Sequence, residues 1–138
     1  MVIISFDVGI KRIGTAVCDK NQTIASPLKV LLNNNTLDRE LKKLFNEYKP
    51  DKVLIGNPVN MDGSKNPDTD FVEKFADKIR KLFPAIEITF WDERLTSKDA
   101  EETMIKFDVS RKKRKNKIDM VAAALILRSY LDNLKGNK

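Results

Sequence analysis

The segment VIISFDVGIKRIGTAVC, residues 2–18, decides the fold. Two apolar runs, 2–7 and 13–18, are rich in the residue types that favour strands, and a five-residue connection containing Gly9 separates them. Runs joined by so short a glycine-containing link predict a β-hairpin, with Gly9 in a turn. The first run ends on an acidic residue, Asp7, at the kind of strand end where open sheets gather ligand sites.

Strand and helix patterns continue along the rest of the chain. Residues 24–30 predict a third strand, placed at a sheet edge or ending early because Pro27 cannot donate a ladder hydrogen bond. The further expected elements are a helix over 37–48, a strand over 52–55, a loop over 56–68, a helix with Asn66 as N-cap and Pro67 in its first turn that runs to Leu82, a strand over 86–91, a helix from Thr96, a basic loop, and a last helix over 117–134. This order predicts an α/β fold in a single domain, 1–138. Its mixed five-stranded sheet consists of a three-stranded antiparallel meander plus parallel strands, flanked by helices.

Composition narrows the class of protein. The 138 residues are 41% hydrophobic and 33% charged, which is ordinary for one globular domain. The longest apolar run, 121–127, is too short to span a membrane, and charged residues interrupt the first apolar stretch as no signal peptide would allow. The lone cysteine, Cys18, predicts a small buried side chain with no internal disulfide. We therefore expect a cytoplasmic protein.

The chain contains no histidine. This excludes histidine-based nucleophilic triads, histidine general bases and histidine-ligated zinc. Twenty Asp and Glu residues remain, and carboxylate oxygens are the ligands that hard cations prefer. A carboxylate-bound metal such as Mg²⁺ is therefore the leading chemical option.

The net charge of +6 is concentrated in one place. Residues 111–117 hold six of the 26 bases and no acid, so the rest of the chain has 20 bases and 20 acids. A patch of this kind fits a polyanion such as nucleic acid, and it equally fits a solvated loop. The charge pattern alone leaves both interpretations open.

Three acidic positions could meet at one site. Asp7 ends the first strand, Asp92 and Glu93 end the last, and Asp119 begins an apolar helix. Because side chains alternate along a strand, only one of the adjacent pair can face the site. Asp119 alone is also explained as a first-turn acid stabilised by the helix dipole. Together, clustered carboxylates must share protons or hold a cation, and metal ions so held cleave phosphodiesters.

Four segments resemble one known family, YqgF/RuvX: FDVGIKRIGTAV (6–17), GNPVNMDGS (56–64), WDERLTSKDAE (91–101) and RKKRKNKIDMVAAALIL (111–127). The resemblance implies a ribonuclease-H-like fold and a Mg²⁺-dependent nuclease, with Mn²⁺ as an alternative ion. It implies that Asp7, Glu93 rather than Asp92, and Asp119 are the catalytic metal ligands. It further implies processing of the 5′ end of precursor 16S rRNA, or, by an older proposal, resolution of Holliday junctions in branched DNA. Asn57 departs from the leucine more usual in the family loop.

Basic residues near these acids are candidates for binding the nucleic-acid backbone, although each could be merely solvated. They are Lys11, Arg12, Arg94, Arg111, Lys112, Lys113, Arg114, Lys115 and Lys117. Trp91, inside an apolar strand, is expected in the core rather than stacked on a base.

Two other functions compete with the nuclease interpretation. A sugar-kinase or actin-like ATPase also follows its first strand with such a hairpin, but it needs two domains and this length supplies one. A non-catalytic nucleic-acid-binding module would use the basic segment and leave the acids idle. The choice of RNA or DNA and the oligomeric state stay open, because neither is readable from the sequence.

Overall fold

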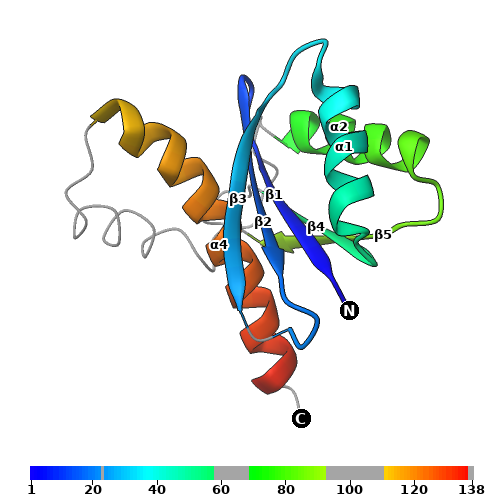
Figure 1. Ribbon diagram of the computed structural model, residues 1–138, viewed down its shortest axis with the longest axis vertical. Helices are drawn as coiled ribbons and strands as arrows, with labels where there is room; N and C mark the ends of the chain where they lie inside the picture. The colour runs from blue at the N-terminus through cyan, green and yellow to red at the C-terminus, as the bar shows by residue number, and fades with distance from the viewer. Residues whose placement is uncertain (23, 58–68, 93–110, 137–138) are drawn as a thin grey trace.

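A computed structural model describes residues 1–22, 24–57, 69–92 and 111–136, the last range with side chains for 121–134. It contains one five-stranded sheet in the order β3-β2-β1-β4-β5. Helices α1 and α2 cover one face of this sheet and α4 covers the other (Figure 1). The described elements are β1 Ile3–Val8, β2 Arg12–Cys18, β3 Ala25–Leu32, α1 Leu37–Tyr48, β4 Lys52–Asn57, α2 Thr69–Leu82, β5 Glu87–Asp92 and α4 Arg111–Gly136.

The predicted hairpin is confirmed. β1 and β2 pair antiparallel from Ile4–Val17 to Val8–Ile13. At the turn, the backbone N–H of Gly9 donates to the carbonyl of Arg12 at 2.9 Å. A Cβ atom at position 9 would lie 2.7 Å from that carbonyl oxygen, so the tight turn needs glycine.

The remaining strands complete a mixed sheet, as the sequence predicts. β3 pairs antiparallel with β2 and lies at the edge, where Pro27 is tolerated because one side of an edge strand needs no donor. β4 pairs parallel with β1, and β5 pairs parallel with β4. The carboxyl ends of β1, β4 and β5 consequently lie at one edge of the sheet, beside the β1–β2 turn.

Two hydrophobic cores lie on the two faces of the sheet. Alternate residues of β1 enter different cores: Ile4 and Phe6 pack with α1 and α2, whereas Ile3 packs with α4. The core under α4 includes buried Cys18, as the sequence predicts, whereas Trp91 is half-buried and packs against this core rather than inside it. This alternation fixes which face of the sheet each strand residue occupies.

One prediction, the basic loop, is wrong. Residues 111–117 form the first two turns of α4, which spans Arg111–Gly136 rather than 117–134. Lysine and arginine are strong helix formers, and the segment contains neither glycine nor proline. Residues 111–117 also extend the part of α4 that packs on the sheet, so the helix does not have to be nucleated again in this segment. Like-charge repulsion, a few tenths of a kcal/mol per pair, is too weak to prevent this.

The other boundaries agree closely with expectation. α1 occupies the predicted range, and β4 extends two residues further, to Asn57. The N-cap proposed at Asn66, the loop beyond Asn57 and the helix expected from Thr96 lie outside the described residues. Among the described helices, none has the length and apolarity needed to cross a membrane.

Candidate functional site

Asp7 is half-buried near the carboxyl end of β1. It alternates with Phe6 and therefore shares the sheet face of Ile3 and Ser5, which is the face that α4 covers. The backbone thus sets this carboxylate between the sheet and the last helix.

The strands beside Asp7 carry glycine at the same level. Gly14 of β2 is the registered partner of Asp7. On β4, Gly56 follows Ile55, which is the partner of Phe6, so it lies at the level of Asp7 on the other side. The two strand positions level with Asp7 therefore carry no side chain, and both glycines are buried.

Asp92 lies on the opposite face. Trp91 packs against the core under α4, and its indole Nε1–H donates to Ser129 Oγ at 3.2 Å. By strand alternation Asp92 then occupies the face of α1 and α2, level with its partner Asn57. Of the two acids that the sequence left open, Asp92 is not on the face of Asp7. Glu93 lies outside the described residues.

The register of α4 relates Asp119 to Asp7. The buried hydroxyl of Ser5 donates to the backbone carbonyl of Ala123 at 2.7 Å, which fixes one point of α4 over β1. Position 119 lies four residues earlier on the same stripe of the helix, about 6 Å along its axis. Asp7 lies two residues further along the strand, about 6.6 Å away.

The step from Ala123 back to Asp119 along α4 and the step from Ser5 on to Asp7 along β1 run in the same direction. Tyr130, later in α4, contacts Lys52 at the beginning of β4, so α4 runs antiparallel to β1 (Figure 1). The turn of α4 that contains Asp119 therefore lies toward the strand end that carries Asp7. The Asp119 side chain itself lies outside the described ones.

Among the side chains that the structure describes, three polar contacts join α4 to the sheet, one from each of three strands. Besides Ser5 and Trp91, Lys52 donates from Nζ to the Tyr130 hydroxyl at 2.8 Å, and it lies 3.7 Å from a Glu87 carboxylate oxygen. The hydrogen bond to Tyr130 is the main cause of a raised Lys52 pKa. Sequence reasoning missed all three contacts. Its one available signal was Ser5, a polar residue in an apolar strand.

The basic residues of the hairpin lie at the same sheet edge as Asp7. Lys11 is exposed, and Arg12 is half-buried at the beginning of β2. Asn33 holds this turn in place, because its backbone N–H donates to Lys11 at 2.9 Å and its side-chain amide to Gly9 at 3.2 Å. The segment 111–117 belongs to α4, directly before Asp119, and its side chains lie outside the described ones. Arg94 also lies outside the described residues.

The donor set fits a hard cation. Carboxylate oxygens are what Mg²⁺ prefers, and the chain offers no histidine or thiol near Asp7 to favour a softer metal. Among the side chains that the structure describes, no three metal-binding groups cluster. Two of the three predicted ligands, Glu93 and Asp119, are not among those side chains.

Comparison with known proteins supports a nucleic-acid enzyme. A family model described as "RuvX: Holliday junction resolvase" matches residues 1–133. A protein of Caldanaerobacter subterraneus subsp. tengcongensis is 39% identical, over 99% of this chain and 100% of its own length. One of Thermoanaerobacter pseudethanolicus is 42% identical, over 98% and 99%. Both carry the name "Putative pre-16S rRNA nuclease".

The fold is also similar to that of a solved structure. The RuvC resolvase of Thermus thermophilus, in complex with a Holliday junction substrate, superposes with a TM-score of 0.59 at 14% identity, over 99% of this chain and 97% of its own. At so low an identity the likeness concerns the fold alone. It confirms the ribonuclease-H-like architecture expected from the sequence.

Proposed function

Because the chain belongs to the RuvX family, we propose that it is a metal-dependent nuclease that hydrolyses a phosphodiester bond at the 5′ end of precursor 16S rRNA. The names of the full-length relatives support the substrate. The observation that carries the proposal is the register of α4 on β1, which sets the Asp119 turn toward the strand end holding Asp7.

Three carboxylates would hold the metal in this proposal. Asp7 supplies one from β1 and Asp119 supplies one from α4. Glu93 would be the third, because the resemblance to the family names it and its neighbour Asp92 belongs to the opposite face of the sheet. Mg²⁺ bound by such ligands supplies an activated water and stabilises charge on the leaving oxygen.

The other residues of the site would bind and orient the nucleic acid. Lys11 and Arg12 follow Asp7 at the same sheet edge and can attract a backbone phosphate toward it. The basic segment 111–117 would hold the backbone further from the reacting bond, and Arg94 would orient Glu93 or bind the phosphate.

The test is cleavage of two matched substrates in Mg²⁺. One is a precursor 16S rRNA fragment that spans the 5′ end, and the other is a four-way DNA junction. We expect the parent protein and Asp92→Asn to cleave the RNA, and Asp7→Asn to cleave neither. Cleavage of the junction alone would replace the proposed substrate by branched DNA. Binding of both substrates with cleavage of neither would favour the non-catalytic module.

A further inference from the structure

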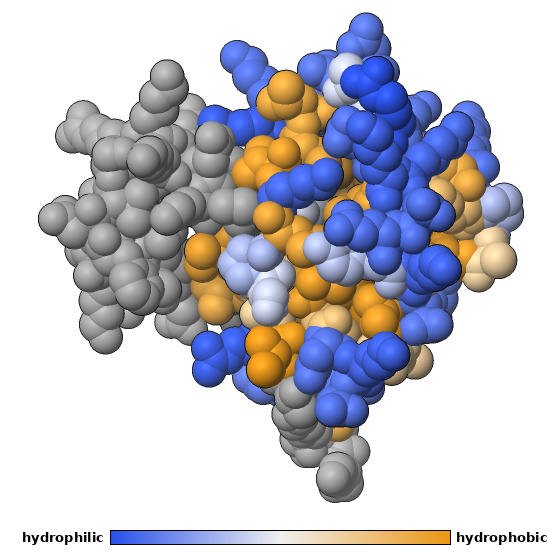
Figure 2. Space-filling view, viewed as in Figure 1, coloured by the Kyte–Doolittle hydropathy of each residue, from blue (hydrophilic) through white to orange (hydrophobic). Residues whose placement is uncertain are grey.

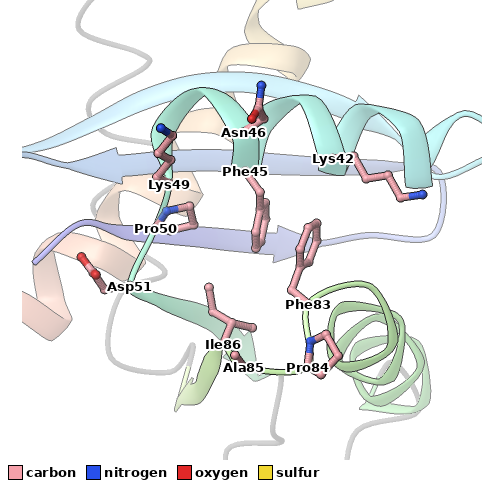
Figure 3. A pocket seen from close by; sticks show the side chains of 10 residues that line it. All are labelled: Lys42, Phe45, Asn46, Lys49, Pro50, Asp51, Phe83, Pro84, Ala85 and Ile86. Atoms are coloured by element: carbon pink, nitrogen blue, oxygen red, sulfur yellow. The ribbon is translucent and has the colours of Figure 1, made fainter.

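A groove of about 640 Å³ lies far from Asp7, between the end of α1 and the connection from α2 to β5 (Figure 3). Its apolar wall contains Phe45, Phe83 and Ile86, and its polar rim contains Lys42, Asn46 and Lys49. The groove adjoins the face of α1 and α2, at the edge where β4 and β5 begin. Asp7 belongs to the other face and to the opposite edge, so the groove is separate from the site described above.

Two stacked aromatic rings form part of the wall. The rings of Phe45 and Phe83 lie 3.9 Å apart between centroids and are inclined by 10° (Figure 3). Phe45 is buried, whereas Phe83 is half-buried and contributes apolar surface to the groove. A flat ring system offers a stacking platform to another flat ring, and aromatic stacking of this kind binds nucleobases regardless of sequence.

The rim is positively charged. Lys42 and Lys49 are exposed, and neither forms an ion pair with a side chain that the structure describes. The nearest lining acid, Asp51, accepts a hydrogen bond from the backbone N–H of Val2 at 2.8 Å. The groove is thus lined by two lysines, one carboxylate and the amide of Asn46 beside an apolar wall, and its excess of positive charge suits an anionic chain that carries flat bases.

We propose that this groove binds a single-stranded segment of the nucleic-acid substrate, with a base against Phe83 and phosphates beside Lys42 and Lys49. The inference rests on the proposed function for the identity of that substrate. A cationic groove with an aromatic wall is how proteins hold single strands without reading their sequence.

The exposed side of α1 connects the groove to the β1–β2 turn, at the sheet edge that carries Asp7. A second groove along α1 shares Lys42 and Asn46 with the first and adds Asp38, Arg39 and Lys43. Arg39 and Lys43 each lie 3.9 Å from a Glu40 carboxylate oxygen. Hydrophilic residues cover α1 on the surface seen in Figure 2. The beginning of α1 lies beside the turn that Asn33 holds, next to Lys11. The 12 residues of α1 span about 18 Å, or about five nucleotides at roughly 3.4 Å each.

The first test is binding of a fluorescent oligoribonucleotide of about twelve nucleotides, long enough to pass the hairpin and cover α1, in EDTA. Lys42→Ala/Lys49→Ala removes two charges from the rim. Lys20→Ala/Lys74→Ala removes two exposed lysines that do not line this groove and serves as the matched control. We expect the rim variant to weaken binding and flatten the slope of log affinity against log salt by about 1.4, or roughly 0.7 per lost contact. The control should keep the parent slope.

The second test removes the aromatic ring while keeping apolar bulk. Phe83→Leu should weaken binding of the oligonucleotide on the order of tenfold and leave binding of an abasic oligonucleotide of equal length unchanged. Thermal unfolding of each variant identifies any that fails to fold, and the two variants remove different groups. Equal losses for both oligonucleotides would overturn the stacking role.

Cleavage separates this inference from the proposed function. Rim variants should cleave a substrate too short to reach the groove as fast as the parent does, and longer substrates more slowly. Parent-like affinity and salt slope in the rim variant, with Mg²⁺-dependent cleavage intact, would overturn the groove proposal alone. Weakened binding in the rim variant of a protein that never cleaves would support the groove and overturn the nuclease. Loss of self-association, with unchanged oligonucleotide affinity, would assign the groove to a second copy of the chain and overturn the proposal.

Discussion

At the scale of single residues, Asp7 is the position whose replacement separates catalysis from folding. Asp7→Asn keeps the shape and removes the charge. If the site acids repel one another without metal, the melting temperature should hold or rise slightly. Metal-free nucleic-acid affinity should also hold or rise, because an anion near the phosphates has gone. Cleavage should fall by orders of magnitude. An unfolded variant would make Asp7 a structural acid, and parent-like cleavage would refute the carboxylate mechanism.

Tyr130 is the residue that tests how α4 is held. Tyr130→Phe removes the acceptor for the Lys52 ammonium, and we expect it to lower the free energy of unfolding at neutral pH by about 1 kcal/mol. The hydrogen bond raises the Lys52 pKa, so its stabilisation is fully present below the ordinary value of 10.5 and disappears as pH rises through the higher folded-state pKa. Urea unfolding at pH 7 and above pH 10.5 measures this. Equal stabilities at pH 7 would show that the contact contributes nothing.

Residue-level inference from the sequence succeeded where one residue type has one structural use. Gly9 in the turn and buried Cys18 were predicted and are observed, whereas Trp91, expected in the core, is half-buried against it. Ser5 was missed because its partner, Ala123, lies 118 positions away. No local pattern indicates which distant carbonyl a buried hydroxyl will meet.

Among the helices and strands, the position of α4 over β1 decides whether Asp119 can reach the metal site at Asp7. Ser5→Ala removes the hydrogen bond that fixes this register. Thr15→Val is the matched control, since the buried Thr15 hydroxyl donates to the Lys29 carbonyl at 2.7 Å and joins β2 to β3 instead. We expect each change to cost about 1 kcal/mol of stability, with only Ser5→Ala weakening Mg²⁺ affinity in calorimetry. Equal losses of Mg²⁺ affinity in Ser5→Ala and Thr15→Val would show that Ser5 contributes to stability alone and does not position the metal site.

The basic first turns of α4 have their own test. Changing Arg111, Lys112, Lys113 and Arg114 to alanine preserves helix propensity and should weaken binding to every nucleic-acid sequence alike. The slope of log affinity against log salt should flatten by about 0.7–0.9 for each lost contact. A control variant loses four exposed bases elsewhere, Lys20, Lys74, Lys81 and Arg128. The same slope in parent and test variant would mean that the segment is only solvated.

Helices and strands were predictable where the hydrophobic period and the residues that end an element indicate the same boundaries. α1 follows an apolar period of 3.6 and ends before Pro50, and the structure gives it the predicted range. The basic segment 111–117 was wrongly predicted as a loop, because a run of charged residues suggests a solvated segment. Like-charge repulsion opposes a helix of lysine and arginine only weakly, so the helix that packs through Ala123 and Leu127 continues back through the segment.

At the scale of the whole molecule, the sheet sorts the acids by face. Its mixed topology could be predicted from element order, since short links make hairpins and helical links make parallel crossovers. The sequence alone could not predict which of Asp92 and Glu93 faces Asp7, because a shift of one residue reverses the faces of a strand. The packing of Trp91 under α4 resolves the face of Asp92.

Whether Asp7 holds the metal is measured by Mg²⁺ titration calorimetry of the parent protein, Asp7→Asn and Asp92→Asn. Both variants lose one carboxylate near the same sheet edge, but only Asp7 belongs to the face that α4 covers. We expect equal Mg²⁺ affinity in the parent and Asp92→Asn, and a loss of at least about tenfold in Asp7→Asn. Parent-like affinity in Asp7→Asn, or a comparable loss in Asp92→Asn, would contradict it.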